Sequence, residues 1–411
     1  MKATIQQENS NWQNKQFLNS SEAAGYLYKS VPIMDGMSGS RIVRNGQELI
    51  NFAGINILGL QEDKKFIDIF CEKTRQYGLA TGGSRLTQGV CRSHLQLEQK
   101  MNQIFQKEYT LTFGSGALAN FGFINSMTAF FAFNDDNKID NRDVVFVLDK
   151  DCHWSLWNPV SKLKYGSQVY AFKHNNPKSL EQVLSKIKSN KIIVIFETVY
   201  SCDGSVAPIA ELLDICERYG ALSYVDDANG FMIYGNANRP FYEDYQALSK
   251  ATFMMVSFSK AVGLEGGAIS GPEEFVKSFE MLSGTSLFTA TMQPPTAATN
   301  LEIINYLQDN PQIMNNYLER CLQLRETLIN LNFELNSTPS YINSIFIGRD
   351  EVAEQVRRDL LEMGYCVPVF RYPAVKRNQA LMRIMLNNQH TESDINGFIA
   401  ALEKVRSRYN F

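Results

Sequence analysis

The sequence predicts an α/β fold, with a large domain built on a mostly parallel, doubly wound sheet and a smaller α+β domain after it. Short apolar runs alternate with helical patterns through the middle of the chain. The length of 411 residues suggests two domains, and the sequence texture changes after about residue 290. We therefore predict an N-terminal arm and entry segment over 1–48, a large domain over 49–289 and a small domain over 290–411.

Each predicted element has its own local signal. The helix before the fourth predicted strand has Pro208 near its start and Gly220 just past its end, where each residue is preferred. The last helix carries a capping pattern, Thr391 followed three residues later by Asp394. Residues 1–20 are polar and are interpreted as a mobile arm. Five short apolar runs are predicted strands: 109–113, 144–148, 192–196, 221–225 and 253–257.

Composition excludes several classes of protein. The net charge of −3 gives no general case for nucleic-acid binding. Seven scattered cysteines form no Cys-x-x-Cys pair, which fits reduced thiols better than disulfides or a zinc site, so no metal is expected. The N-terminus lacks the apolar core of a secretory signal, and the most apolar stretch, 121–133, is too short to span a bilayer. A cytoplasmic protein without an integral membrane segment is expected.

The chemistry is indicated first by Lys260, which follows a predicted strand in the sequence Ser257-Phe258-Ser259-Lys260. Asp226 ends the preceding predicted strand. A carboxylate followed by a lysine in this order is how many enzymes hold pyridoxal phosphate: the amine forms a Schiff base and the Asp pairs with the pyridine nitrogen. Alone, Lys260 would be a surface charge and Asp226 a helix cap.

A candidate phosphate site precedes this pair. Gly114-Ser115-Gly116 follows a predicted strand and opens a helix, where free backbone N–H groups can bind an anion. Many such Gly-x-Gly sequences are only tight turns. Order along the chain favours the binding interpretation here, because the Asp and Lys elements come afterwards.

Three further residues have a functional and a structural interpretation. His153 lies in a loop after a strand, and its imidazole could stack on the cofactor ring or simply cap backbone groups. Ser201 could reach the cofactor's phenolic oxygen or serve only the turn before Asp203-Gly204. Arg383 interrupts an apolar strand, so its guanidinium needs a partner, either a substrate carboxylate or a structural carboxylate.

Together these motifs resemble the α-oxoamine synthases, pyridoxal phosphate enzymes of fold type I, with serine palmitoyltransferase the most similar in texture. The likeness runs from about residue 50 to the C-terminus. It rests on residues 56–60, 81–85, 115–120, 153–155, 200–204, 257–260 and 372–375, and on His94, Glu98, Asp226, Arg383, His390 and Thr391.

This resemblance implies a role for each candidate residue. Lys260 would carry the Schiff base, His153 would stack on the ring, and Asp226 would hold the pyridine nitrogen. The family works as homodimers with active sites at the subunit interface. The resemblance also implies contacts with the phosphate from Ser115, Gly116, Ala117, Ser257 and a partner subunit's Thr289, with the phenolic oxygen from Ser201 and Asn229, and with the substrates from Arg383, Asn56, Arg85 and Leu86.

One position departs from the family. Asn229 stands where a histidine normally meets the phenolic oxygen, and an amide can donate a hydrogen bond but cannot change charge near neutral pH. Leu86 stands where members that use succinyl-CoA carry a polar residue, which favours an uncharged acyl chain.

The implied reaction is a decarboxylative condensation of an α-amino acid with an acyl thioester on CoA or a carrier protein, giving an α-amino ketone and CO2. Burial should lower the pKa of Lys260, so that the freed amine can act as a base. Two alternatives remain at this point. One is another fold type I reaction, such as transamination or aldol cleavage, and the other is a catalytically weakened regulatory subunit, which Asn229 favours and Lys260 opposes.

Overall fold

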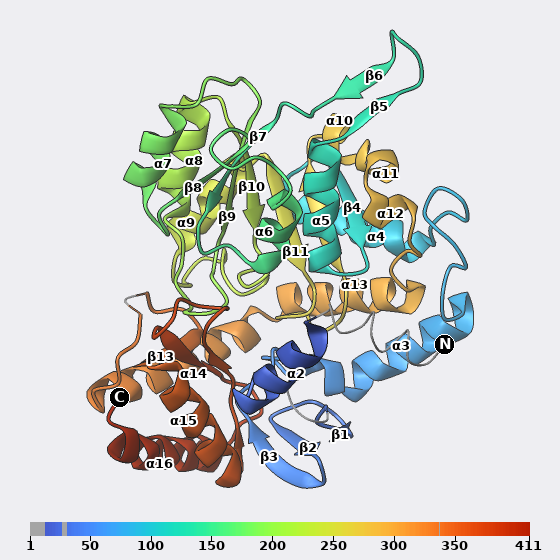
Figure 1. The fold of residues 1–411 in the computed structure, drawn as a ribbon. Helices are drawn as coiled ribbons and strands as arrows, with labels where there is room; N and C mark the ends of the chain where they lie inside the picture. Colours follow the sequence, from blue (N-terminus) through green and yellow to red (C-terminus); the bar gives the residue numbers. More distant parts are fainter. Residues whose placement is uncertain (1–12, 27–30, 337) are drawn as a thin grey trace, which may run out of the picture.

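The computed structural model describes residues 13–26, 31–336 and 338–411. Its largest sheet, whose strands β4 and β7 to β11 are labelled in Figure 1, has seven strands. All of them are parallel except β12, which runs antiparallel to both neighbours. In sheet order these strands are β4 (Tyr109–Phe113), β12 (Gly267–Gly271), β11 (Phe253–Ser257), β10 (Leu222–Asp226), β9 (Ile192–Glu197), β7 (Val145–Asp149) and β8 (Val169–Phe172).

The alternation of side chains along the strands builds a core on each face of this sheet. In β9, Val194 and Phe196 join one apolar cluster, whereas Ile193 and Ile195 join the other. Such strands are apolar throughout because helices cover both faces. The first cluster takes side chains from α4 (Arg92–Phe105), α7 (Pro177–Leu184), α8 (Ile209–Arg218) and α13 (Pro294–Asp309), and the second from α5 (Gly116–Met127), α6 (Trp154–Val160), α10 (Glu273–Val276) and α11 (Phe279–Leu282).

The five predicted strands are all present, with ends that shift by at most one residue. The predicted helix between β9 and β10 is α8, with Pro208 immediately before it and Gly220 after it in a left-handed conformation (φ 62°). β8 and β12 were not predicted. β12 begins at Gly267, where a side chain would bring its Cβ to 2.7 Å from the backbone nitrogen of Gly116. This glycine is therefore required by close packing against the start of α5.

The small domain has an antiparallel sheet in the order β13-β16-β15. Three helices, α14, α15 and α16, lie around it (Figure 1). The predicted cap of its last helix is confirmed: Asp394 N–H donates to Thr391 Oγ1 (3.1 Å), and Thr391 N–H donates to Asp394 Oδ2 (2.9 Å). The elements are β13 (Ile342–Gly348), β15 (Val369–Phe370), β16 (Ala380–Met385), α14 (Pro311–Asn330), α15 (Asp350–Glu362) and α16 (Glu392–Tyr409).

A second sheet joins the two ends of the chain. β1 (Met34–Asp35), β2 (Arg41–Arg44) and β3 (Gln47–Asn51) form a meander, and β3 pairs in parallel with β14 (Tyr365–Cys366). The entry segment before residue 49 is thus held by the small domain's chain. The predicted domain boundaries themselves stay predictions.

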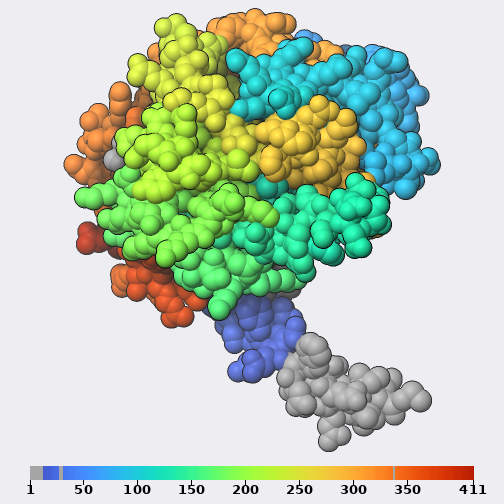
Figure 2. Space-filling view, turned by 90° about the horizontal axis from the view of Figure 1, so that it is seen from above, coloured from blue at the N-terminus to red at the C-terminus, as the bar shows by residue number. Residues whose placement is uncertain are grey.

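Of the residues expected to form a mobile arm, 1–12 lie outside the described residues, whereas 14–20 belong to a helix that the sequence analysis did not predict. Residues Asn14–Ala23 form α2, which lies at the edge of the molecule in Figure 2. Arg371 of the small domain holds its end, because its guanidinium donates to the carbonyls of Ala24 (3.0 Å) and Gly25. A long-range contact that polar composition does not encode thus fixes this helix.

The remaining helices and a hairpin lie around this body. The hairpin of β5 (Phe130–Ala132) and β6 (Lys138–Asp140) projects away from it in Figure 1. Within the described part of the chain, no helix has both the length and the apolar character needed to cross a membrane. The other helices are α3 (Lys64–Tyr77), α9 (Tyr242–Gln246), α12 (Gly284–Leu287), η2 (Leu60–Glu62) and η3 (Ala247–Lys250).

Candidate active site

A cavity of about 930 Å³ lies at the carboxyl ends of the parallel strands and is closed on one side by the small domain. This is where doubly wound folds bind ligands, because strand ends and helix starts meet there. Ten of the residues named from the sequence line it: Ser115, Gly116, Ala117, His153, Ser201, Asp226, Asn229, Ser257, Lys260 and Arg383.

One end of the cavity is a cradle at the start of α5. Ser115 caps the helix, with its hydroxyl accepting from the N–H of Leu118 (3.2 Å). A Cβ on Gly116 would lie 2.9 Å from the Cβ of Ser257, so only glycine leaves the backbone N–H groups open. Ser257 and Ser259 share a hydrogen bond between their hydroxyls (2.9 Å). Free N–H groups, hydroxyls and the positive end of a helix suit a phosphate.

Asp226 supplies a buried carboxylate at the end of β10. Its Oδ2 accepts from Asn120 Nδ2 (2.9 Å), and its Oδ1 accepts from the N–H of Ala228 (3.0 Å). Burial raises the pKa of Asp226, although these hydrogen bonds favour the charged form. A buried carboxylate is most stable next to a cation, so this geometry suits a protonated ring nitrogen.

His153 is oriented by a chain of hydrogen bonds that sequence reasoning did not find. The hydroxyl of Tyr224 donates to Asn120 Oδ1 (2.7 Å), and Asn120 Nδ2 donates to Ser155 Oγ (2.9 Å). Ser155 Oγ lies 2.7 Å from His153 Nδ1, and its N–H also points to that nitrogen (3.3 Å). Nδ1 is therefore an acceptor, and the neutral ring carries its proton on Nε2. Burial lowers the pKa of His153, which favours this neutral form.

Lys260 faces the same space from the segment after β11. Burial lowers its pKa to about 8, and the positive charge of Arg383 contributes in the same direction. Asp226 and Glu197 oppose that decrease without cancelling it. An amine with a pKa near neutrality is a better nucleophile and base than a solvated lysine.

Glu197 is a site residue that the sequence analysis missed. It ends β9 beside Asp226, is buried, and accepts a hydrogen bond from the N–H of His153. Burial and the charge of Asp226 raise its pKa. Its position at the end of an apolar strand was the signal, the same one that pointed to Asp226.

Arg383 reaches the cavity from β16 of the small domain. Its Nη1 donates to the backbone carbonyl of Ser201 (2.9 Å), and its guanidinium carbon lies 4.8 Å from the ring centre of Phe370. Among the described residues its Nε, although buried, has no hydrogen-bond partner. A buried donor without a partner is costly, so the guanidinium suits an anionic ligand.

Asn229 and Thr289 have local partners in the single chain. Asn229 Nδ2 donates to the carbonyl of Val199 (3.1 Å), so this amide holds the segment after β9 from within the cavity wall. Thr289 lies outside the cavity, with its hydroxyl 3.4 Å from the carbonyl of Ala290. Its predicted phosphate contact concerns a partner subunit and stays a prediction.

The structure does not bring Asn56, Arg85 or Leu86 to the cavity of the single chain. Each of the three guanidinium nitrogens of Arg85 donates to a carboxylate, Nη1 and Nη2 to Glu98 (2.8 and 2.9 Å) and Nε to Glu280 (3.0 Å). Asn56 Nδ2 donates to the carbonyl of Ser38 (3.3 Å) and to Glu62 Oε1 (3.2 Å), and its Oδ1 accepts from the N–H of Gly59 (3.1 Å). Leu86 is about half exposed. The carboxylates that bind Arg85 lie 13 and 195 positions away in the sequence, and residue type alone could not reveal these contacts.

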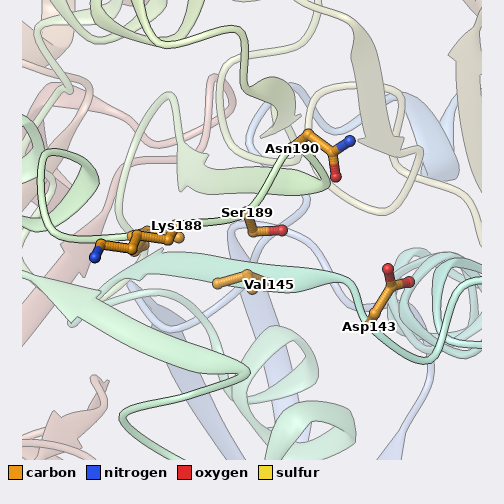
Figure 3. Close-up of a pocket in the computed structure, with 6 residues that line it drawn as sticks. Asp143, Val145, Lys188, Ser189 and Asn190 are labelled. Atoms are coloured by element: carbon orange, nitrogen blue, oxygen red, sulfur yellow. The ribbon is translucent and has the colours of Figure 1, made fainter.

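Another hollow, of about 720 Å³, lies at the opposite end of the sheet (Figure 3). It contains none of the candidate site residues predicted from the sequence, and an exposed ion pair, Lys191 with Asp143 (2.7 Å), lies at its edge. Polar, mostly exposed side chains of this kind give no catalytic arrangement. It is lined by Asp143, Val145, Ile187, Lys188, Ser189 and Asn190.

A doubly wound sheet that brings a lysine of low pKa, a buried aspartate and a helix-start phosphate cradle into one cavity defines a pyridoxal phosphate enzyme of fold type I. Residues 48–402 match the family described as aminotransferase class I and II. The chain belongs to this family and, within it, to the α-oxoamine synthases, which are pyridoxal phosphate-dependent acyltransferases.

Relatives and solved structures agree on this placement. The 8-amino-7-oxononanoate synthase of Herminiimonas arsenicoxydans is 30% identical over 373 residues, which covers 90% of this chain and 92% of the relative. That of Thermoanaerobacter pseudethanolicus is 27% identical over 386 residues, covering 93% and 94%. Serine palmitoyltransferase from S. paucimobilis, with bound PLP and myriocin, has the same fold: its TM-score is 0.86 at 22% identity, covering 98% of this chain and 99% of that one.

Proposed function

We propose that this protein condenses an α-amino acid with an acyl thioester and releases an α-amino ketone, CO2 and the thiol carrier. The observation that carries the proposal is the convergence on one cavity of Lys260, Asp226 and Arg383, whose Nε has no hydrogen-bond partner among the described residues. This set provides an amine for the cofactor, a negative charge for its ring nitrogen and a guanidinium that can bind a carboxylate through two N–H groups. The named 8-amino-7-oxononanoate synthases and serine palmitoyltransferases support the same reaction type.

Pyridoxal phosphate, when bound, supplies an electron sink for negative charge at the amino acid's Cα. The chain's residues do the rest. Lys260 holds the cofactor and then takes the Cα proton on Nζ, because burial lowers its pKa to about 8. About a tenth of such an amine is unprotonated at pH 7, far more than for a solvated lysine. Asp226 stabilises positive charge on the ring nitrogen, and the cradle at Gly116 and Ser257 fixes the phosphate.

Arg383 orients the amino acid. We propose that Nε and a second N–H of its guanidinium bind the substrate carboxylate as a fork, while Nη1 stays on the carbonyl of Ser201. His153, with its ring on the cavity wall and its Nε2–H free of the Ser155 network, covers one face of the site. Asn229 and Ser201 remain our proposed contacts for the phenolic oxygen.

The part of the cavity wall that the small domain contributes favours an apolar acyl group on the substrate. Phe346, Phe370 and Leu381 line the cavity on the same side as Arg383 and are partly accessible. Apolar walls lower the free energy of an uncharged acyl chain and penalise a terminal carboxylate. The proposal therefore favours an uncharged acyl donor, in line with the prediction made from Leu86.

We further propose a homodimer in the cytoplasm. The exposed phenyl ring of Phe288 (85% exposed) and the position of Thr289 outside this chain's own cavity favour a partner subunit that receives this segment.

The test is CoA release by purified protein loaded with pyridoxal phosphate, with glycine, L-alanine and L-serine each paired with acyl-CoAs of rising length. We expect CoA release that needs both an amino acid and an acyl-CoA, with no keto acid added. Activity that instead requires a keto acid would show a transaminase and overturn the proposal. No thiol release under any pairing, with the acyl group supplied either on CoA or on a carrier protein and with the cofactor covalently bound, would also overturn it.

A further inference from the structure

The residues from 200 to 205 form a turn that connects the two sides of the active-site cavity. Its Ser201 and Cys202 line the cavity. Four of its backbone carbonyls accept hydrogen bonds from the small domain, and the first is that of Ser201, which accepts from Arg383 Nη1 (2.9 Å), as described above. The other three donors are the hydroxyl of Ser344, to the Cys202 carbonyl (2.6 Å), the hydroxyl of Ser340, to the Gly204 carbonyl (2.5 Å), and the amide of Asn336, to the Asp203 carbonyl. The position of this turn therefore sets the position of the Arg383 guanidinium.

On its other side the turn is held by a histidine outside the cavity. His174 follows β8, and its Nε2 lies 2.9 Å from Ser205 Oγ. Its Nδ1 lies 3.0 Å from Oδ1 of Asp149, a fully buried carboxylate at the end of β7. The imidazole also packs edge-on against the ring of Tyr200, with centroids 4.3 Å apart. One side chain thus ties the turn to two neighbouring strands of the large sheet.

Hydrogen-bond directions decide the charge of this imidazole. Asp149 is an acceptor when ionised, so Nδ1 must donate. The hydroxyl of Ser205 donates to Asp203 Oδ1 (2.8 Å), so its oxygen is left to accept from Nε2. Both ring nitrogens of His174 are then donors, which is the protonated form.

The groups that face His174 agree with this charge. Asp149 and Asp151 approach from the end of β7, with Asp151 at 3.9 Å, and Asp203 approaches from the turn. Burial disfavours the imidazolium, but the hydrogen bond and charge of Asp149, with the other two carboxylates, raise the pKa of His174 above 6.5. By contrast, the pKa values of His94, His153 and His390 are lowered by burial.

The same atoms could be mistaken for a hydrolytic serine, histidine and aspartate set. The hydroxyl of a nucleophilic serine must donate its hydrogen bond to the histidine. The hydroxyl of Ser205 instead donates to Asp203 and accepts a hydrogen bond from His174. The arrangement holds a turn in place and does not activate a hydroxyl.

We propose that His174, as an imidazolium, is a positioning residue for the condensation: it bridges Asp149 to Ser205 and so fixes the turn whose Ser201 carbonyl orients Arg383 toward the amino-acid carboxylate. This inference rests on the proposed function, because it takes Arg383 as the carboxylate site. When the imidazolium loses its Nε2 proton, Nε2 becomes an acceptor. The hydroxyl of Ser205 must then turn away from Asp203 to donate to Nε2, and the hydrogen bond between Ser205 and Asp203 within the turn is lost.

The experiment measures amino-acid binding to the pyridoxal phosphate-loaded enzyme by calorimetry, with glycine, L-alanine and L-serine and no acyl donor. The variants are His174→Gln, which keeps a donor but cannot be charged, and Ser205→Ala, which breaks the tie and leaves the His174–Asp149 pair. Lys173→Gln, an exposed neighbouring charge, is the matched control. We expect Kd to rise about fivefold to tenfold in both variants at pH 7 and to stay at the wild-type value in the control.

A pH series separates positioning from a general loss of stability. In the wild-type protein, Kd should rise as the pH passes through the pKa of His174, and this rise should be missing from His174→Gln. Ring ¹⁵N NMR of histidine-labelled protein, with His174 assigned from the spectrum of His174→Gln, should show both nitrogens protonated at pH 7. A neutral His174 ring at pH 7, or variants that melt earlier with unchanged Kd, would overturn the inference. Wild-type binding without CoA release would instead count against the proposed condensation alone.

Discussion

Replacement of Arg383 by lysine tests the proposed carboxylate site most directly. The change keeps a positive charge on β16 but removes the planar fork and the Nε donor, which has no partner among the described residues. Lysine can offer one of its N–H groups to the carbonyl of Ser201 and a single point charge to the substrate. The variant should therefore bind the cofactor normally and the amino acid poorly.

The size of the effect follows from the lost hydrogen bonds. A hydrogen bond to a charged group contributes about 1.5–3 kcal/mol, and Arg383→Lys loses at least one of the two N–H groups available for the carboxylate. Since about 1.4 kcal/mol is a factor of ten, KM for the amino acid should rise about tenfold to hundredfold. KM for the acyl-CoA should stay within about twofold, because that substrate does not depend on the fork.

The assay is initial-rate CoA release, with the amino acid varied at saturating acyl-CoA and then the reverse. Arg320→Lys is the matched control: Arg320 also donates to backbone carbonyls, of Asn388 (2.7 Å) and His390 (2.5 Å), but lies outside the cavity. It should lower Tm without changing either KM. A rise in KM for acyl-CoA with no change for the amino acid would show that Arg383 holds the other substrate and would refute the reasoning.

Two further predictions concern the cofactor site. Lys260→Met should abolish the covalent pyridoxyl label that borohydride fixes on the wild-type chain, as peptide mapping would show. Without cofactor at pH 7, the same variant should have a higher free energy of unfolding than the wild-type apoprotein, by at most about 3 kcal/mol in a denaturant titration. The reason is that a lysine whose pKa is lowered to about 8 in the folded protein destabilises the folded state below that pH. The penalty is relieved as the pH rises from about 8 towards the unfolded value, so the two proteins should converge; a constant gap would contradict the cause given. Gly116→Ala should lower cofactor affinity about tenfold or more in a fluorescence titration, since its Cβ would lie 2.9 Å from that of Ser257, whereas Gly114→Ala, with ordinary contacts of 3.5 Å, should bind as the wild type does; equal affinities would refute the cradle.

Local patterns predicted the strand ends that carry the chemistry. The apolar runs before Asp226 and Ser257 set both residues at the same edge of a parallel sheet, and the structure has both strands within one residue of the prediction. Lys260 and Gly116 follow from the same reasoning, because each comes directly after a strand. Short-range signals suffice where the strand direction alone decides where a side chain lies.

The features that the sequence did not predict depend on contacts between residues that are far apart along the chain. Arg85 was predicted near the substrate, but Glu98 and Glu280 occupy its guanidinium, and α2 exists where polar composition suggested an arm, because Arg371 binds its end. Asn120 was part of the family resemblance but was given no role, although it links Asp226 to the His153 network. Such contacts join residues up to several hundred positions apart, and a single sequence contains no local signal for them.

The pairing of β3 with β14 has a consequence for how the chain is made. The seven-stranded sheet is complete within residues 109–271, so it can form while a ribosome still holds the following segment. The meander at residues 34–51 must wait for Tyr365 and Cys366 before its open edge is paired. During synthesis that edge is an unprotected strand, and early termination before residue 365 should leave a product prone to aggregate through it.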